Sequence, residues 1–449
     1  MENLDGTIIA TAAPQIAADL RVDPVDVNLA MTVYLITIAV GIPISGWLTD
    51  RFGGRRILMI AIAVFTVASA LCAVSVNLPM LVTMRVLQGA GGALMVPVGR
   101  LVVLRVTAKK DMLDAVAYLT WPALLAPVIA PALGGWIVTV ASWEWIFLIN
   151  IPLGIVAFVV AARIVPDTST SQQRDLDWVG FLLCAAALGG LLIGVESIRP
   201  TESSLIAHSV AAVAIVALFW LAWWWLRRTP HPLVRFDALR QQSFRVSNVG
   251  GSVYRLVISA IPFLLPLLFQ VGFGWSPARA GFLVLLLFLG NVGIKPATSP
   301  LIRRFGFRLV LIGSIAGGAL ALAGIALLRP TTPVWLMATV LILSGAFRSI
   351  GFSAYNSLQY ADIKPEQMAD ANTLGSTMQQ MAVGLGIALG ALLLRAGDLI
   401  VPNGEPTDAY AVAFFALGVL MLQPLAQAIL LHRTAGSEIA GARPSTGSR

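Results

Sequence analysis

The chain has 449 residues, of which 58% are hydrophobic and 12% charged, and its mean hydropathy is +0.85. A soluble domain of this size needs more polar residues to cover its surface, so a soluble fold is excluded. The net charge of +8 comes from basic residues clustered between apolar runs, which indicates membrane topology and not nucleic-acid binding. Cys72 and Cys184 lie in separate apolar runs, and the sequence shows neither a disulfide framework nor a metal-binding spacing.

Apolar runs long enough for a helix to cross about 30 Å of hydrocarbon recur along the whole chain. Because the backbone in lipid must satisfy its own hydrogen bonds, we expect an all-α integral membrane protein. In chain order the predicted spans are 3–19, 27–48, 57–76, 79–104, 114–138, 144–165, 177–196, 205–226, 246–270, 278–299, 309–328, 334–359, 371–395 and 409–431. The first is short, so either it begins at the membrane surface or, as we favour, the natural helix begins upstream of Met1.

The basic residues are divided unevenly between the two sets of connections. Most of the 30 lysines and arginines lie in one set and in the C-terminal tail, whereas the opposite set holds Arg21, Arg199, Arg279, Arg329 and Arg395. Positive residues favour the cytoplasmic side, so both termini are predicted to be cytoplasmic. The expected location is the bacterial cytoplasmic (inner) membrane.

An internal repeat relates residues 46–55 to residues 299–308, which share Leu, Arg-Phe-Gly and Arg at matching positions. Such a repeat predicts two homologous halves in parallel orientation. The second copy follows eight spans after the first instead of six, so two extra helices must separate the halves. The predicted organisation is an N-terminal six-helix bundle at 1–165, two inserted transmembrane linker helices at 166–230, a C-terminal six-helix bundle at 231–431 and a disordered cytoplasmic tail at 432–449.

The connection after the second span, residues 46–56, has the pattern Gly-x-Leu-x-Asp-Arg-x-Gly-x-Arg-Arg and is called the latch loop below. Its glycines permit close helix approach and a tight turn, and its carboxylate can pair with an arginine or cap a helix. We expect these charges to hold one half of the protein against the other and to separate when it rocks. The alternative is an ordinary basic loop. The predicted latch residues are Gly46, Asp50, Arg51, Gly53 and Arg55.

Two ionisable residues lie within the predicted spans of the first half. Arg85 is in the fourth span, where a guanidinium costs about 2.5–3.5 kcal/mol to insert and so normally faces a cavity or a partner. Asp5 is nearly the only acidic residue within a core span, and a desolvated carboxylate in a helical bundle can load and release a proton. We therefore expect Asp5 to couple proton movement. The alternatives are a helix-end carboxylate at Asp5 and a structural bond to backbone carbonyls at Arg85.

The second half carries buried positive charge without matching acids. Arg255 and Arg348 fall near the middle of their spans, and a guanidinium binds oxyanions in bidentate fashion. This pattern favours an anionic cargo over a cationic drug, unless the arginines pair with structural groups away from the cavity. Polar residues predicted to line the substrate cavity are Gln88, Arg255, Tyr254, Asn291, Arg348, Asn356, Gln359 and Gln379.

Several motifs resemble those of the major facilitator superfamily. The latch loop resembles its signature loop. The run Arg85–Gly92 resembles a second motif whose arginine is linked to proton transfer, which assigns Arg85 to proton coupling beside Asp5. The fifth span resembles the motif of the antiporter branches, although Ala126 and Ala130 replace two of its glycines. The residues that carry this last likeness are Pro127, Pro131, Gly134 and Gly135.

The stretches Leu4–Ala17 and Trp143–Gly154 are typical of the fourteen-helix drug:proton antiporter family, and the chain resembles its MdtD-like multidrug exporters over essentially its whole length. The resemblance implies the major facilitator fold, with two six-helix bundles plus two inserted linker helices, 14 transmembrane helices in all. It also implies export of a small molecule by alternating access in exchange for protons.

These features predict a proton-coupled efflux antiporter that is not an enzyme. The chain has no phosphate-binding loop of an ATP-driven pump and no His-Glu-x-x-His or Ser-His pairing of an intramembrane enzyme. The alternatives are an exporter of an organic anion or a metal–polycarboxylate chelate, and a transport-inactive membrane sensor. The expected partners are a small-molecule substrate, protons and the lipid bilayer; we expect a monomer, with no nucleic acid, cofactor or metal.

Overall fold

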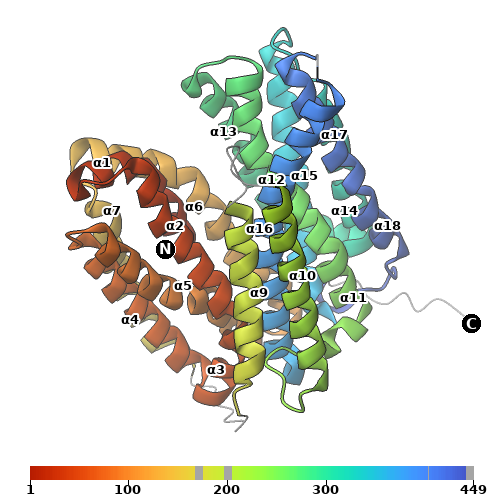
Figure 1. Cartoon of the computed structure of the whole chain (residues 1–449). Coiled ribbons are helices and arrows are strands. Elements are labelled where there is room, and N and C mark those ends of the chain that lie inside the picture. The colour runs from red at the N-terminus through yellow and green to blue at the C-terminus, as the bar shows by residue number, and fades with distance from the viewer. Residues whose placement is uncertain (167–174, 197–204, 403, 441–449) are drawn as a thin grey trace, which may run out of the picture. The chain divides into compact units, whose positions relative to one another are not determined.

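The computed structural model describes residues 1–166, 175–196, 205–402 and 404–440, and over these residues it is helical with no strand (Figure 1). Ten helices in the described part are long and apolar enough to cross a membrane, and Trp178–Gly194 and Arg279–Gly293 are shorter apolar helices. Each predicted span overlaps a helix or consecutive helices. The prediction of an all-α membrane protein is confirmed.

The helices follow the predicted order. The first half contains α1 (Glu2–Leu20), α2 (Pro24–Gly41), α3 (Ser45–Phe52), α4 (Gly54–Ala73), α5 (Leu78–Val106), α6 (Met112–Val140), α7 (Trp145–Leu148) and α8 (Asn150–Ile164). The linker helices are α9 (Trp178–Glu196) and α10 (Leu205–Arg228). The second half contains α11 (Gln242–Arg245), α12 (Gly251–Leu267), α13 (Pro277–Gly293), α14 (Lys295–Ala326), α15 (Val334–Ala361), α16 (Met368–Ile400), α17 (Pro406–Leu420) and α18 (Leu422–Leu430). Within the expected tail lies α19 (Ser437–Ala440), and residues 441–449 are outside the described residues.

The chain divides into two compact units that do not follow the midpoint of the sequence. The first unit consists of Met1–Val106, Pro122–Phe236 and Pro365–Thr377. The second consists of Thr107–Trp121, Asp237–Lys364 and the chain from Met378 onward. The start of α6 therefore packs with helices of the second half, and the start of α16 packs with helices of the first. The linker helices α9 and α10 belong to the first unit.

The second spanning helix of each half is interrupted by a proline and then ends at a glycine. Pro43 lies in the 3-10 turn Ile42–Ile44 between α2 and α3, and Pro296 lies at the start of α14, just after α13 ends. Proline donates no backbone hydrogen bond, so a helix kinks or restarts there. Ten residues later the chain turns at Gly53 (φ 85°) and Gly306 (φ 75°), a conformation that favours glycine. The internal repeat thus has a proline and a glycine turn at matching positions in both copies.

The tenth span is predicted to end at residue 299, but the helix that contains this residue continues beyond it. Helix α14 continues beyond it until the turn at Gly306 and then resumes as the next span. Arg303 and Arg304 marked this stretch as a loop in the sequence. They are instead helical, because the helix continues beyond its apolar segment, just as α3 carries Asp50 and Arg51 in the first half.

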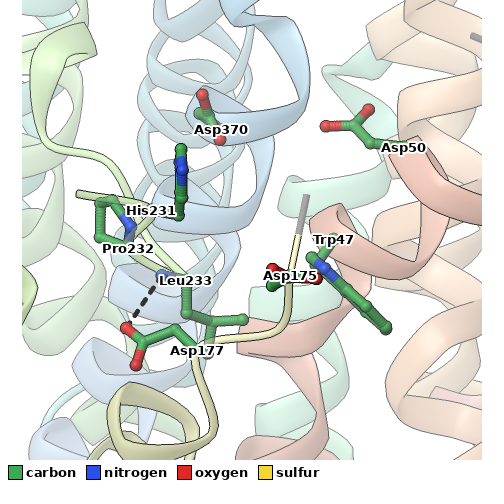
Figure 2. A pocket seen from close by; sticks show the side chains of 8 residues that line it. All are labelled: Trp47, Asp50, Asp175, Asp177, His231, Pro232, Leu233 and Asp370. Carbon is green, nitrogen blue, oxygen red and sulfur yellow. Dashed lines mark hydrogen bonds between the residues drawn. The ribbon is translucent and has the colours of Figure 1, made fainter. Parts of the chain in front are cut away.

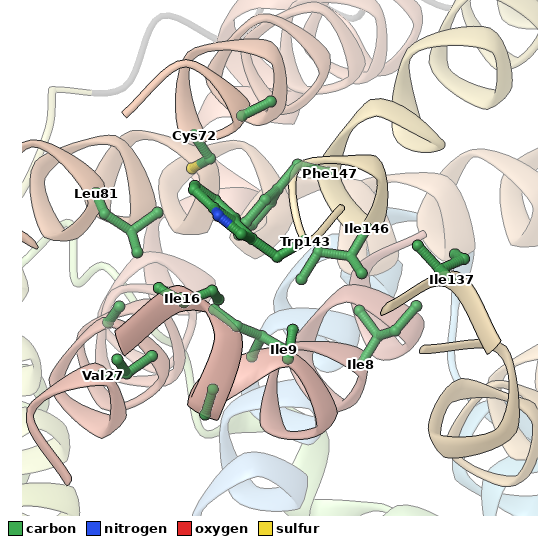
Figure 3. Close-up of a cluster of buried hydrophobic side chains, with 14 of the residues drawn as sticks. Ile8, Ile9, Ile16, Val27, Cys72, Leu81, Ile137, Trp143, Ile146 and Phe147 are labelled. Atoms are coloured by element: carbon green, nitrogen blue, oxygen red, sulfur yellow. The ribbon is translucent and has the colours of Figure 1, made fainter. Parts of the chain in front are cut away.

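Helix α1 lies in an apolar core of the first unit. Figure 3 shows Ile8, Ile9 and Ile16 of α1 among side chains from the neighbouring helices and from the segment before α7. Trp143 in that segment also donates its indole N–H to Asp19 at 2.7 Å. Burial of apolar surface around α1 fixes the helix that carries Asp5, and so positions the site described next.

The linker helices α9 and α10 lie side by side (Figure 1), and α9 also packs against α2. Asp177 connects the two linker helices through hydrogen bonds. Its carboxylate accepts hydrogen bonds from Gly180 N at the start of α9 (2.8 Å) and from Trp225 Nε1 of α10 (3.0 Å). The linker helices are therefore tied to each other and to the first half.

Candidate functional site

A buried ion pair joins α1 and α5. An Nη1–H of Arg85 donates to Oδ2 of Asp5, and both side chains are completely buried. The guanidinium also donates from Nε to the carbonyl of Ala30 at 3.3 Å and lies over the ring of Tyr34, 3.8 Å from its centroid. The two charges compensate each other, and the aromatic face further stabilises the cation at a position that is not exposed to bulk solvent.

Three neutral side chains complete this group, which is called the Asp5 cluster and comprises Asp5, Ser69, Arg85, Gln88 and Asn150. Oδ1 of Asp5 accepts from Asn150 Nδ2 (2.8 Å) and from Gln88 Nε2 (3.1 Å). The hydroxyl of Ser69 accepts from the same two amides at 3.0 and 3.1 Å. The carboxylate therefore links α1, α5 and α8, and the two amides link α4 to them through Ser69.

The Asp5 carboxylate is the acceptor on which the cluster depends. A proton on this carboxylate would remove the charge that balances Arg85 and turn one oxygen from an acceptor into a donor. In addition, Arg85 Nη2 and Asn150 Oδ1 are buried without a hydrogen-bond partner among the described residues. One donor and one acceptor are thus left for a water or ligand, and the cluster is chemically able to exchange partners.

The structure brings Asp5 and Arg85 together as partners, which the sequence did not indicate. Gln88, expected to line the substrate cavity, lies in the Asp5 cluster. Sequence reasoning missed Ser69, Asn150 and Tyr34 as members or neighbours of the site. Asn150 was detectable, because it is a polar residue in an apolar run within a stretch that had already been singled out. Ser69 and Tyr34 carry no comparable signal.

The latch loop is held at both of its ends. Asp50 accepts from Arg105 of α5 at 2.6 Å, and Arg55 donates to the carbonyl of Ala162 on α8. A Cβ at Gly46 would overlap the side chain of Thr373 on α16, so any larger residue would require Thr373 to move. Arg51 lies beside the ring of Trp47, 5.6 Å from its centroid.

The antiporter-like motif lies on α6, where its two glycines have different surroundings. A Cβ at Gly134 would overlap Thr11 and Ile8 of α1, whereas a Cβ at Gly135 would meet nothing within 4 Å. Gly134 therefore sets the close contact between α6 and the helix that carries Asp5. Pro127 and Pro131 also lie on α6, but their side chains fall outside what the structure describes.

An arginine also joins the first and fourth spanning helices of the second half. Arg255 of α12 donates to the carbonyl of Ser247 (3.0 Å) and to Oδ1 of Asn356 on α15 (2.9 Å). The hydroxyl of Tyr254 lies 3.1 Å from the carbonyl oxygens of both Phe347 and Arg348. These predicted cavity residues are thus brought together on α12 and α15.

Other predicted cavity residues of the second half have buried polar atoms without a hydrogen-bond partner among the described residues. Nη1 of Arg348, Nε2 of Gln359 and both amide atoms of Asn291 are buried and have no hydrogen-bond partner within the described chain. Gln379 is half-buried on α16. Unpaired buried polar groups are costly, so in a membrane bundle they indicate a solute or water that completes them.

A small acidic hollow of about 20 Å³ lies in the first unit and has room for about one water molecule. Figure 2 shows Asp177 accepting from the backbone N–H of Leu233 at 3.4 Å beside this hollow. Among the described residues, no group of His, Cys, Asp and Glu is arranged to hold a metal ion. The hollow is lined by Trp47, Asp50, Asp175, Asp177, His231, Pro232, Leu233 and Asp370.

Comparison with known proteins identifies relatives over nearly the whole chain. The family model described as Major Facilitator Superfamily matches residues 1–181, 177–387 and 248–438. MdtD of Cronobacter sakazakii, named as a proposed multidrug resistance protein, is 35% identical over 433 residues, which cover 94% of this chain and 90% of the relative. Its counterpart in Pectobacterium atrosepticum is 36% identical over 430 residues, covering 94% of this chain and 91% of the relative.

Two solved structures share the fold at low sequence identity. The human organic anion transporter MFSD10 (TETRAN) gives a TM-score of 0.66 at 13% identity, covering 95% of this chain and 96% of that one. The proton:xylose symporter XylE gives a TM-score of 0.65 at 13% identity, covering 98% and 95%. The similarity extends over both halves of the chain.

Proposed function

Because the chain belongs to the major facilitator superfamily, we propose that it is a proton-coupled antiporter that exports a small molecule by alternating access. It is a multi-pass membrane transporter and not an enzyme. We place it in the bacterial inner membrane with both termini in the cytoplasm, on the basis of its bacterial relatives and the distribution of its basic residues.

The Asp5 cluster is the observation that supports proton coupling. In the outward-open state a proton binds Asp5, and Arg85 then loses its only carboxylate partner in the described chain. The freed guanidinium and the amides of Gln88 and Asn150 must find other partners, which shifts the relative stability of the two states. Proton and cargo can drive each other only if they favour different states, and a charge change at Asp5 provides such a difference.

Flux in proteoliposomes tests this mechanism. A pH gradient should drive cargo movement by the wild-type protein, and Asp5→Asn should abolish that movement while preserving exchange of labelled for unlabelled cargo, which needs no proton turnover. Asp19→Asn is the matched control, because Asp19 lies on the same helix but outside the cluster and should behave as wild type. Gradient-driven flux that survives in Asp5→Asn would exclude Asp5 as the coupling group.

A second candidate concerns the cargo, which we propose to be an organic anion or a metal–polycarboxylate chelate. The supporting observation is the buried Nη1 of Arg348, which lacks a hydrogen-bond partner within the described residues, with further unpaired polar atoms on Asn291 and Gln359. A cavity for lipophilic cations would instead need acids. The test compares cationic dyes with citrate-like anions in the same proteoliposomes, with and without Arg255→Gln and Arg348→Gln. Movement of cations but not anions would reject this candidate.

The same flux assay separates a transporter from a membrane sensor that keeps the transporter fold. A sensor would be stable and correctly inserted but would move neither cations nor anions under any gradient. The names of the relatives refer to multidrug resistance, which favours export.

A further inference from the structure

The second unit contains a cavity of about 420 Å³ that the proposed coupling mechanism does not use. It lies between the first turns of α6 and the first turns of α14. Its lining combines one buried ammonium group with aromatic and proline surfaces. The lining residues are Asp114, Ala117, Tyr118, Trp121, Lys295, Pro296, Ser299 and Pro300.

Lys295 is the buried cation of this cavity, with 7% of its surface exposed. Its Nζ donates to the hydroxyls of Ser353 and Thr120. The Thr120 hydroxyl donates in turn to the carbonyl of Val116 at 3.0 Å, so it can serve Lys295 only as an acceptor. An ammonium group has three N–H donors, and these two bonds leave the third for a ligand.

No acidic side chain of the described chain neutralises Lys295. Asp114 lines the same cavity, but its carboxylate forms an ion pair with Arg303 at 2.8 Å. A buried ammonium without a counter-ion is expensive and in membrane proteins marks a functional site. The missing negative charge is therefore available from a bound anion.

The internal repeat shows that the fold does not require a lysine here. Lys295 precedes Pro296 at the helix interruption, and the matching residue of the first half is the buried, apolar Ile42 before Pro43. In the first half the helical turn that follows Ile42 contains Gly46, which packs tightly against Thr373 and leaves no cavity between the two residues. The second half has an open cavity and a cation at the equivalent place, so the two copies differ in the chemistry of this position.

The other wall of the cavity is aromatic. Tyr118 and Trp121 lie one turn apart on α6 and are 74% and 42% exposed. The volume lies within the range of about 300–1,000 Å³ that suits small-molecule sites. We propose that this cavity binds an amphipathic anion, whose carboxylate or phosphate contacts Lys295 and whose hydrocarbon part packs on Tyr118 and Trp121.

Equilibrium binding of 11-(dansylamino)undecanoate to the full-length protein in phosphatidylcholine nanodiscs, with empty nanodiscs subtracted, tests the site. Lys295→Gln should weaken binding about tenfold, because a charge-assisted hydrogen bond is lost. Tyr118→Ala, an exposed position that does not threaten folding, should weaken it several-fold. Lys110→Gln removes the same charge from an exposed residue outside the cavity and should leave binding unchanged.

Further binding measurements identify the ligand and distinguish this site from the proton-coupling site. The methyl ester of the probe should bind poorly, and Asp5→Asn should bind the acid as well as wild type does. Competition by added phosphatidylglycerol would assign the site to a lipid headgroup, and competition by laurate alone would assign it to free amphiphiles. Equal binding of acid and ester, or wild-type affinity in Lys295→Gln, would overturn the proposal.

Discussion

The charge compensation at Asp5 and Arg85 is the residue-scale feature on which the coupling mechanism depends. Each charge is buried completely, so neither can be screened by water. Removing one partner of such a pair leaves an isolated charge in a low-dielectric environment, whereas removing both leaves none. Stability measurements on single and double variants can therefore establish whether the pair is a true charge couple.

We expect Asp5→Asn to destabilise the protein by about 3–5 kcal/mol, the usual cost of stranding a buried charge. The double variant Asp5→Asn with Arg85→Gln should recover most of that loss, since it buries only neutral amides. Thermal unfolding in detergent measures both. If Arg85→Gln lowers the stability of Asp5→Asn by as much as it lowers the stability of the wild type, the two residues do not act as a pair.

The sequence predicted Asp5, Arg85 and Gln88 as site residues but not Ser69 or Asn150. Asp5 and Arg85 stand out because ionisable residues are rare in apolar runs, whereas Ser69 resembles any serine in a membrane helix. Their pairing could not be predicted from the sequence, because Asp5 and Arg85 are 80 residues apart in the chain and meet only through tertiary packing. For the same reason the bonds of Gln88 to Asp5 and Arg85 could not be predicted from the sequence.

At the scale of elements, close helix contacts depend on particular glycines. The motif on α6 contains two adjacent glycines that the sequence could not distinguish, and only Gly134 faces α1. Side chains on a helix point in different directions at successive positions, so adjacent residues have different neighbours. This difference predicts opposite outcomes for the same substitution.

Gly134→Ala should push α6 away from Ile8 and Thr11 and disturb the helix that carries Asp5. We expect a loss of stability of about 1–3 kcal/mol, typical of overpacking, and impaired proton-driven flux. Gly135→Ala should be neutral or slightly stabilising, because alanine favours helix and meets no atoms. Thermal unfolding and flux of the two variants provide the comparison. Equal effects would show that α6 does not depend on this contact.

The turn in α14 requires glycine because of its backbone conformation, and not because neighbouring atoms leave too little room for a side chain. Gly306→Ala should cost about 1–2 kcal/mol, because its φ of 75° is unfavourable for alanine even though a Cβ there would meet nothing within 4 Å. Gly313→Ala is the control in the same helix, with equally free surroundings and ordinary helical geometry, and should stabilise by about 0.5–1 kcal/mol. Denaturation midpoints that shift equally for both would contradict the assigned turn.

Helix positions could be predicted well from apolar runs, because twenty-residue apolar stretches have few alternatives in lipid. Interruptions within helices were less visible. The sequence repeat indicated two halves, but the matching breaks at Pro43 and Pro296 and the helical state of Arg303 emerged only from the backbone. Charged residues mark the end of an apolar segment, which is not always the end of the helix.

At the scale of the whole molecule, the membrane interior carries more positive than negative charge. Asp5 balances Arg85, whereas Lys295 and Arg348 form no ion pair with another described residue. The cargo-charge proposal follows from this imbalance and has a consequence for energetics. Export of a monoanion in exchange for an entering proton moves two positive charges inward, whereas exchange of a monocation for one proton moves none.

The membrane potential should therefore drive anion export strongly. Each elementary charge gains about 2.3 kcal/mol per 100 mV, so the two charges gain about 4.6 kcal/mol when the interior is negative. In proteoliposomes of known orientation, loaded with a monovalent organic anion and clamped by a potassium gradient with valinomycin, efflux should rise as the interior becomes more negative at constant pH gradient. Arg348→Gln should abolish this efflux at every potential, because it removes the guanidinium whose Nη1 has no hydrogen-bond partner among the described residues and would bind the anion. Wild-type efflux of the anion that is independent of potential would contradict its exchange for an entering proton.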